Sequence, residues 1–292
     1  MRDTNGADTR TVRFSPVLAP RVSVLTLAWK NADLLARCLE SLQRHLPHGL
    51  AEVVILLNGA NSDVVDYVRG YVVGAKVVVS EVNLGFAGGC NRAAAFATGE
   101  YLVLLNDDTE IEPDWLEALV ETADEHSTAG AVGSRILFPD GSLQEAGCII
   151  WSDGTTMPIG RHDASEANAF AHPRRVDYCS ACSLLIRRSV WDALRGMDEN
   201  YYPAYYEDVD FCLRVQLAGG MVIYEPRSQI RHRQSASTDE HFRRFVWSRS
   251  HQYFSNKWRD VLPTFEHADP ASPASVHRAI RRARVGSPTA AP

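Results

Sequence analysis

The chain has 292 residues, of which 45% are hydrophobic, and its formal net charge at pH 7 is −6. This length suffices for one large α/β domain or two small ones, with a substantial core. The acidic balance argues against nonspecific binding of nucleic acid, which depends on an excess of basic side chains.

Strand-like and helix-like segments alternate through the first half of the chain. Residues 32–44 place Leu35, Cys38 and Leu42 on one face of a predicted helix. After the third strand, the glycine-rich residues 83–91 predict a loop that leads into a helix ending at Gly99. The strands are predicted at residues 22–27, 52–57, 77–79 and 101–105. This alternation is typical of a doubly wound, mostly parallel sheet.

An acidic turn, Asn106-Asp107-Asp108, closes the fourth strand. Ligands of open α/β sheets bind at the carboxyl ends of the strands, so both carboxylates are expected to face a crevice. A short acidic loop there suits a hard divalent cation and the phosphates that it carries. A solvated turn that caps the next helix explains the tripeptide about equally well.

The second half of the chain is less regular. Residues 140–175 are rich in glycine, serine and aspartate and predict a long loop excursion. A helix is expected at residues 207–217, a strand at 221–225 and a basic, aromatic helix at 239–258. We expect flexible ends at residues 1–19 and 261–292, and one domain spanning residues 20–260.

Glu207 and Asp208 begin the first of these helices, and His232 follows the predicted strand. Each has an ordinary explanation, because acids at a helix N-terminus are favoured by the dipole and Asp210 with Arg214 forms an i,i+4 pair. A histidine between arginines is commonly a surface residue. Their order along an α/β chain, after the acidic turn, favours a site.

These segments resemble family 2 glycosyltransferases, and within them the rhamnosyltransferase-like and galactofuranosyltransferase-like members. The resemblance covers about residues 22–258 and implies the GT-A fold, with nucleotide-sugar and acceptor halves in one domain. It also implies a nucleotide-diphosphate-sugar donor, Mg²⁺ or Mn²⁺, and inversion at the anomeric carbon. The motifs that carry it are residues 83–91, Leu104-Leu105-Asn106-Asp107-Asp108, Gly196-Met197-Asp198-Glu199, residues 206–214 and Ile230-Arg231-His232.

The resemblance implies roles residue by residue. Asp108 matches the last acid of the metal motif, Asp107 supports the ribose or the metal, and His232 completes the metal shell. Asp208, in the Glu207-Asp208 motif, matches the catalytic base. The expected donor-binding residues are Trp29, Asn58, Asn83, Gly85, Phe86, Gly88, Asn91, Asp107 and Arg249.

The chain also departs from the family pattern. Leu57 stands where an aspartate usually binds the nucleobase, so base recognition falls to backbone groups or to Asn58, Asn61 or Asp63. The donor base and sugar therefore stay open, with a rhamnose-like sugar or another hexose expected. The acceptor is expected to be a hydroxyl of a glycan or a lipid-linked sugar.

No apolar stretch approaches the roughly 20 residues that cross a bilayer, and the polar N-terminus lacks a signal-peptide pattern. We expect a cytoplasmic protein without structural disulfides, since its six cysteines lie in apolar or helical patterns. The basic, aromatic helix admits two interpretations: peripheral contact with the inner face of the plasma membrane, or packing of its aromatics on the domain, which is favoured.

Two other functions fit parts of the pattern. A sugar-nucleotide pyrophosphorylase needs a glycine-rich loop after the first strand, whereas residues 28–31 contain no glycine. A non-catalytic nucleotide-sugar or carbohydrate-binding relative is conceivable because of Leu57 and Ala28. Retention of Asp108, Glu207, Asp208 and His232 together argues against it.

Overall fold

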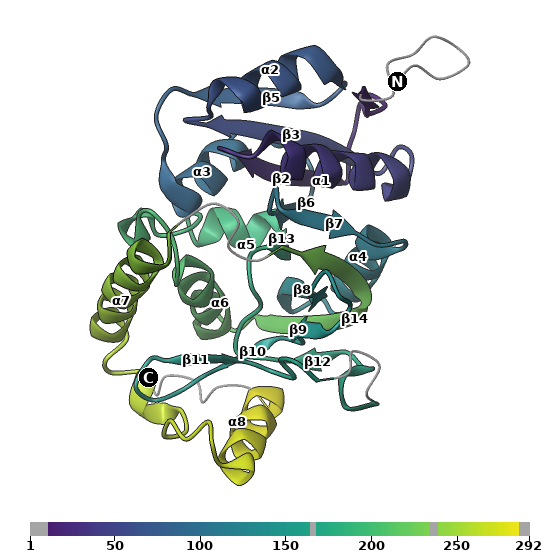
Figure 1. Ribbon diagram of the computed structural model, residues 1–292. Helices are drawn as coiled ribbons and strands as arrows, with labels where there is room; N and C mark the ends of the chain where they lie inside the picture. The colour runs from purple at the N-terminus through teal and green to yellow at the C-terminus, as the bar shows by residue number, and fades with distance from the viewer. Residues whose placement is uncertain (1–10, 164–167, 234–238, 286–292) are drawn as a thin grey trace.

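The computed structural model describes residues 11–163, 168–233 and 239–285. Its centre is a ten-stranded mixed sheet of order β12-β14-β8-β13-β6-β2-β3-β5, with β7 paired to β14 and β9 to β8. Helices flank both faces of the sheet (Figure 1). The core accordingly forms two clusters, one containing Leu35 and Val24 and the other containing Cys90 and Leu25.

The first half of the chain forms the parallel part of this sheet, as the apolar pattern predicts. All pairings among its four strands, β6-β2, β2-β3 and β3-β5, are parallel. Asn31 and Asn61 cap α1 and α2 by accepting hydrogen bonds from backbone amides of the first turn. The elements are β2 (Val22–Ala28), α1 (Ala32–His45), β3 (Ala51–Asn58), α2 (Ser62–Tyr71), β5 (Lys76–Ser80), α3 (Gly85–Ala94) and β6 (Tyr101–Leu105).

The glycine-rich segment is a helix rather than the loop that we predicted. It forms α3, which starts at Gly85 and packs against β2 and β3. A Cβ atom at Gly89 would lie 2.4 Å from Leu27 Cδ2, so the glycine permits a close approach of the helix to the sheet.

The second half adds the mixed part of the sheet. β13 pairs antiparallel with both β6 and β8, and β8 pairs parallel with β14. β14 runs to His232 instead of ending at Glu225, because a register shift between Glu225 and Gln229 lets the strand continue past Pro226. The elements are β7 (Thr109–Ile111), α4 (Trp115–Glu125), β8 (Ala129–Leu137), β13 (Ser183–Arg187), α5 (Arg188–Ala193), η2 (Glu199–Tyr201), α6 (Glu207–Leu217), β14 (Met221–His232) and α7 (Glu240–Lys257).

The prediction of a long loop at residues 140–175 is wrong for the part of this stretch that the structure describes. It contains several short elements, each of only two or three residues, too short for a periodic pattern. They are β9 (Leu143–Glu145), β10 (Cys148–Ile150), β11 (Thr156–Pro158), η1 (Asn168–Phe170) and β12 (Arg174–Arg175). All six cysteines are buried free thiols. None of the helices in the described ranges is long and apolar enough to cross a membrane.

The ends of the chain are more ordered than we predicted. β1 (Val12–Arg13) pairs with β4 (Val72–Val73). Beyond residue 260, η3 (Leu262–Thr264) and α8 (Pro273–Val285) replace the expected flexible tail, and α8 contacts β10 and β12. Only residues 1–10 and 286–292 of the predicted ends lie outside the described residues.

An ion pair between Arg282 and Asp177 explains why α8 packs against β10 and β12. Asp177 is fully buried, and Arg282 Nη2 donates to its Oδ2 at 2.7 Å and to Ile150 O at 3.3 Å. Glu266 accepts from Nε of the same arginine at 2.7 Å. Composition alone gave no sign of this contact, because its partners are more than a hundred residues apart.

Arg282→Met is expected to lower the free energy of unfolding by about 3–5 kcal/mol, because it leaves the carboxylate of Asp177 buried without its cation. Urea unfolding measures the loss. The control is Arg281→Met on the exposed side of the same helix, which should change stability by less than about 0.5 kcal/mol. Equal effects of the two substitutions would contradict the anchoring role.

Candidate functional site

The acidic turn lies at the carboxyl end of β6, where the sequence places it. Asn106 donates its backbone N–H to Cys182 O at 3.1 Å, and Thr109 Oγ1 donates to Asn106 O at 2.7 Å. Burial, followed by the neighbouring charge of Asp108, raises the pKa of Asp107 to about 7. A backbone hydrogen bond from Trp29 to Asp107 opposes that rise. Asp107 therefore sits in a poorly solvated position that favours a cationic neighbour.

Asp108 and His232 are brought together by strand register. β7 pairs antiparallel with the end of β14 and aligns Thr109 with His232. His232 Nε2 lies 3.2 Å from Asp108 Oδ1, and the two side chains are only 10% and 11% exposed. Asp108 Oδ1 is nevertheless a buried oxygen without a properly oriented hydrogen-bond donor. One lone pair of this carboxylate is thus left for a cation.

Gln144 supports the imidazole from the other side. Its Nε2 atom lies 3.1 Å from His232 Nδ1, while its Oε1 atom is buried without a hydrogen-bond partner. Exchanging the two amide atoms would let Oε1 accept from Nδ1–H and leave His232 Nε2 with a free lone pair. This tautomer is the one that a metal-binding histidine uses when its other nitrogen donates to a support.

Glu207 and Asp208 begin α6, after Tyr205 and Tyr206, which adopt left-handed backbone angles with φ of 73° and 72°. Asp208 Oδ2 accepts from Ala181 N at 3.2 Å, and its Oδ1 accepts from Val209 N at 2.9 Å. Burial raises the pKa of both carboxyl groups, and Asp208 raises that of Glu207 further. A buried carboxylate of raised pKa is a stronger proton acceptor than an exposed one.

Residues 180–182 connect the two acidic groups. Ala181 binds Asp208, and Cys182 binds the backbone of Asn106. Asp108 and Asp208 both raise the pKa of the buried Cys182 thiol, after burial itself. The two carboxylates that the sequence singles out therefore lie near one another at the same edge of the sheet.

Glu145 is a further acid of this site that the sequence did not indicate. Its Oε1 atom accepts from Ser180 N at 2.9 Å, and burial raises its pKa to about 7, with Asp208 raising it and His232 lowering it. It lies in β9, within the stretch predicted to be a loop. A three-residue strand gives no periodic signal, so only the structure could find it.

The predicted donor-binding residues line the segment from β3 to α3, but their amides are occupied within the chain. Asn58 accepts from Leu84 N at 2.8 Å and donates to Gly85 O at 3.0 Å. Asn83 Oδ1 accepts from Gly85 N at 2.7 Å. The two asparagines thus shape the turn before α3, and their contact with a donor stays a prediction.

The remaining predicted donor residues lie around the segment that precedes α6. Asn91 donates to Met197 O at 2.9 Å and to Glu199 Oε1 at 2.8 Å, and a Cβ atom at Gly88 would lie 3.6 Å from Glu199. Phe86 N donates to Pro203 O at 2.8 Å. Arg249 donates to Tyr202 O in the same segment. Trp29 lies elsewhere, and Lys30 Nζ is 3.7 Å from the centroid of its ring.

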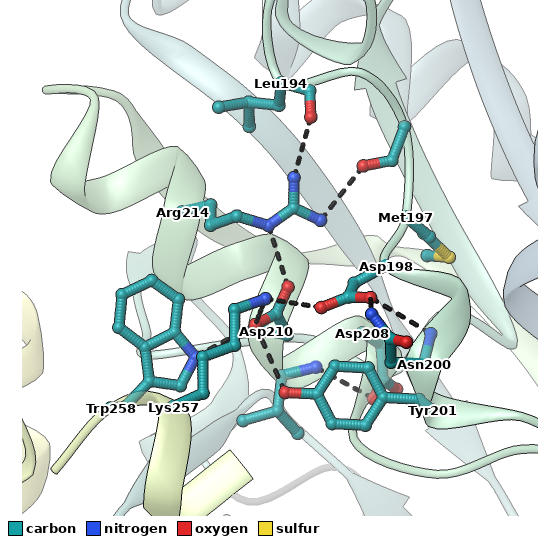
Figure 2. A network of polar contacts seen from close by, with 12 residues as sticks. Leu194, Met197, Asp198, Asn200, Tyr201, Asp208, Asp210, Arg214, Lys257 and Trp258 are labelled. Carbon is teal, nitrogen blue, oxygen red and sulfur yellow. Dashed lines mark hydrogen bonds and ion pairs between the residues drawn. The ribbon is translucent and has the colours of Figure 1, made fainter. Parts of the chain in front are cut away.

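A buried acid two residues beyond Asp208 anchors α6. Figure 2 shows Asp210 between Arg214, Lys257, Trp258 and Tyr201. Asp210 is fully buried and accepts from Arg214 Nε at 2.7 Å, Trp258 Nε1 at 2.9 Å and Tyr201 OH at 3.2 Å, and Lys257 Nζ lies 2.7 Å from Oδ1. The predicted i,i+4 pair with Arg214 is confirmed, but it is one contact of a larger network.

The same network reaches the donor side of the site. Lys257 also donates to Asp198 Oδ2 at 2.7 Å, and Asp198 caps η2 by accepting from Asn200 N at 3.0 Å (Figure 2). Arg214 donates to Leu194 O and Gly196 O, both at 2.9 Å. Because Asn91 of α3 binds Met197, residues 194–201 join α3 to the helix that carries Asp208.

The stability of the folded protein should depend on the ionisation of Glu145. Its pKa is about 7 in the folded chain and near 4.5 when exposed, so the folded chain retains a proton that the unfolded chain releases. The stability that this group contributes is complete below pH 4.5 and is lost as the pH rises through 7.

Urea unfolding at several pH values tests this dependence. Glu145→Gln should flatten the fall in stability between pH 5 and 7.5 by up to about 1.4 kcal/mol per pH unit, because it removes the ionisation. Glu81→Gln, at an exposed position, is the control and should leave the profile unchanged. Superimposable profiles for all three proteins would exclude the buried titration.

Comparison with known proteins agrees with this arrangement. Residues 23–194, more than half of the chain, match the family described as Glycosyl transferase family 2. The O-antigen biosynthesis protein RfbC of Myxococcus xanthus is 30% identical over 237 residues, which are 77% of this chain and 18% of that protein. The N-acetylglucosaminyl-diphospho-decaprenol L-rhamnosyltransferase of Mycobacterium tuberculosis is 26% identical over 189 residues, 56% of this chain and 60% of the relative.

A solved structure supports the fold. GalNAc-T7, crystallised with UDP, GalNAc and Mn²⁺, superposes with a TM-score of 0.65 at 16% identity, covering 92% of this chain and 55% of that one. This chain therefore spans only part of the length of each of these proteins. The fold expected from the resemblance is confirmed, and the chain belongs to glycosyltransferase family 2, with the GT-A fold.

Proposed function

We propose that the protein is an inverting, metal-dependent glycosyltransferase that moves a sugar from a nucleoside diphosphate to a hydroxyl group of a glycan or lipid-linked acceptor. Membership of the family supports nucleotide-sugar chemistry. The observation that carries the proposal is the convergence of the Asp108–His232 pair and Asp208 on residues 180–182. One side offers ligands for a cation and the other offers a base.

The residues at the acidic turn fit a divalent cation. Asp108 Oδ1 is buried and lacks a hydrogen-bond donor, His232 Nε2 lies beside it, and Asp107 adds a second carboxyl group. In the described ranges, no group of three or more His, Cys, Asp or Glu side chains is arranged to hold a metal ion by itself. Mg²⁺ and Mn²⁺ suit such an open set, because substrate phosphates and water complete the shell.

The chemistry assigned to Asp208 follows from where charge moves. As the acceptor oxygen bonds to the anomeric carbon, the bond from that carbon to the phosphate oxygen breaks and the nucleoside diphosphate leaves. Asp208 takes the proton of the acceptor hydroxyl, and Ala181 N and Val209 N hold its oxygens in place. A bound cation would offset the charge that develops on the leaving diphosphate.

The structure also suggests how this chain orders its donor. Asn58, Asn83 and Gly85 form the turn before α3, and the network around Asp210 fixes α6 relative to it. A preformed site of this kind avoids reorganisation when charge develops. Glu207, with Oε2 buried and without a hydrogen-bond partner, lies next to the base, and burial raises the pKa of its carboxyl group.

The names of relatives support a class of acceptor. The Mycobacterium tuberculosis relative is named for transfer of rhamnose to a sugar linked through diphosphate to decaprenol, and the Myxococcus xanthus relative for O-antigen biosynthesis. We therefore propose a cell-envelope polysaccharide or its lipid-linked precursor as the acceptor, and a hexose or deoxyhexose as the transferred sugar.

Asp208→Asn should reduce transfer by about 10²–10⁴-fold, because the amide cannot accept the proton of the acceptor. Product formation from a panel of nucleotide-sugars measures the loss, and donor binding should persist. Asp66→Asn, at an exposed position of α2, is the matched control. In the wild-type protein, the transfer rate should fall as the pH drops through the raised pKa of Asp208. Near wild-type transfer by Asp208→Asn would remove this residue from the mechanism.

Gln144→Leu should weaken Mn²⁺ binding by about 10–100-fold, because His232 loses the group that orients its ring. Calorimetric titration of Mn²⁺ into protein saturated with UDP or GDP measures the affinity. Gln252→Leu on the exposed side of α7 is the control. Unchanged affinity in both variants would show that Gln144 does not support a metal ligand.

A further inference from the structure

The first half of α7 presents an unusual surface. Phe242 is 49% exposed, Phe245 66% and Trp247 40%, which places three of the large exposed hydrophobic side chains on two turns of one helix. Arg243 and Arg244 lie between them in the sequence. We call these five residues the α7 surface.

The rest of the helix shows why this exposure is informative. Val246, Ser250 and Phe254 are the buried residues of α7, and the helix ends at the anchored Lys257 and Trp258. Packing on the domain, the interpretation favoured from the sequence, therefore holds for the face of the helix that carries these residues, whereas Phe242 and Phe245 stay exposed. Phe242 keeps about half of its area in water and Phe245 about two thirds, so both leave apolar area that the fold does not bury.

The α7 surface lies close to the loop that carries the candidate base. Trp247 packs on Tyr206 with ring centroids 5.6 Å apart. A hollow of about 320 Å³ is lined by Tyr205, Glu240, Arg243, Arg244 and Trp247. Tyr205 precedes Asp208 by three residues, so a molecule that covers this surface contacts the segment that leads into the helix carrying the candidate base. Figure 1 places α7 at the edge of the molecule, beside α6.

The charge of α7 selects the kind of partner. Lys257 is paired with Asp198 and Asp210 within the fold, so Arg243 and Arg244 are the basic residues of the α7 surface, against Glu240. Arg244 pairs with Glu240 at 2.5 Å, and Arg243 faces the rim of the hollow. Exposed aromatics interleaved with arginines match the interface of a bilayer, where rings enter the headgroup layer and arginines meet lipid phosphates.

We propose that the α7 surface docks the protein onto an anionic lipid bilayer. Phe242 and Phe245 insert among the headgroups, and Arg243 and Arg244 bind acidic lipids. The docked orientation would hold the opening beside Tyr205 toward the membrane, where a lipid-linked sugar is presented. This last consequence rests on the proposed function, whereas binding to the bilayer does not.

Sedimentation of the full chain with large unilamellar vesicles tests the proposal. Vesicles of phosphatidylcholine with 30% phosphatidylglycerol should bind the protein, pure phosphatidylcholine should bind it at least tenfold more weakly, and 0.5 M NaCl should weaken the anionic binding. Phe242→Ser with Phe245→Ser should lower the partition coefficient at least tenfold. Arg243→Gln with Arg244→Gln should lower it about 25-fold, since each basic residue near such a surface contributes about fivefold.

Matched controls lie elsewhere on the surface. Val79→Ser replaces a side chain that is 54% exposed on β5, and Arg259→Gln replaces one that is 80% exposed beyond α7. Both should bind vesicles like the wild type, and all variants should keep the wild-type melting temperature, which shows that they fold.

Three results would overturn the proposal. The first is no binding of wild-type protein to anionic vesicles, and the second is an equal loss of binding in the controls. The third is a dimer in light scattering that the phenylalanine variants dissociate, which would assign the surface to a second copy of the chain. Loss of transfer in Asp208→Asn is measured separately, so a failure of the proposed function and a failure of docking are distinguishable.

Discussion

The backbone of residues 180–182 is the constraint on which the site depends. Buried carboxylates are stable only when donors reach their oxygens, and this short segment supplies donors to two of them. Ser180 N binds Glu145 and Ala181 N binds Asp208, while Cys182 O accepts from Asn106 at the acidic turn. Because the segment leads directly into β13, which lies between β6 and β8, these acids are fixed to the centre of the sheet.

The acids of this region differ in how completely hydrogen bonds and ion pairs compensate their charge. That difference separates the acids that stabilise the fold from those that remain available for chemistry. Asp210 is surrounded by Arg214, Lys257, Trp258 and Tyr201, so its charge is matched within the fold. Lys257 also lowers the pKa of Asp198 to about 2, against the effect of burial. Asp108 instead keeps an oxygen without a donor, and no cation of the described chain pairs with Asp208. Incompletely matched carboxylates are the ones that a metal ion or a proton can still stabilise.

Much of the fold could be predicted because the sequence patterns that indicate its strands and helices are local. The apolar runs of β2, β3 and β6 are continuous, and α6 starts and ends where its acids and glycines predict. Asp108 and His232 were singled out by resemblance and meet through the pairing of β7 with β14. Neither Glu145 nor the Arg282–Asp177 pair could be predicted, because both depend on contacts between short or distant segments. The glycines of α3 predicted a loop because their packing role against Leu27 is tertiary.

The two ends of α7 differ in what they contact. At its C-terminal end, Lys257 and the adjoining Trp258 contact Asp210, two residues beyond Asp208, so this end cannot shift without moving the helix that carries the candidate base. At its N-terminal end, Phe242 and Phe245 lie in water. A rigid helix fixed at one end holds its other end in a defined position, so whatever binds the exposed aromatics is oriented relative to Asp208. The Asp210 network would then matter beyond stability: it would couple the attachment surface of the protein to the geometry of its chemistry.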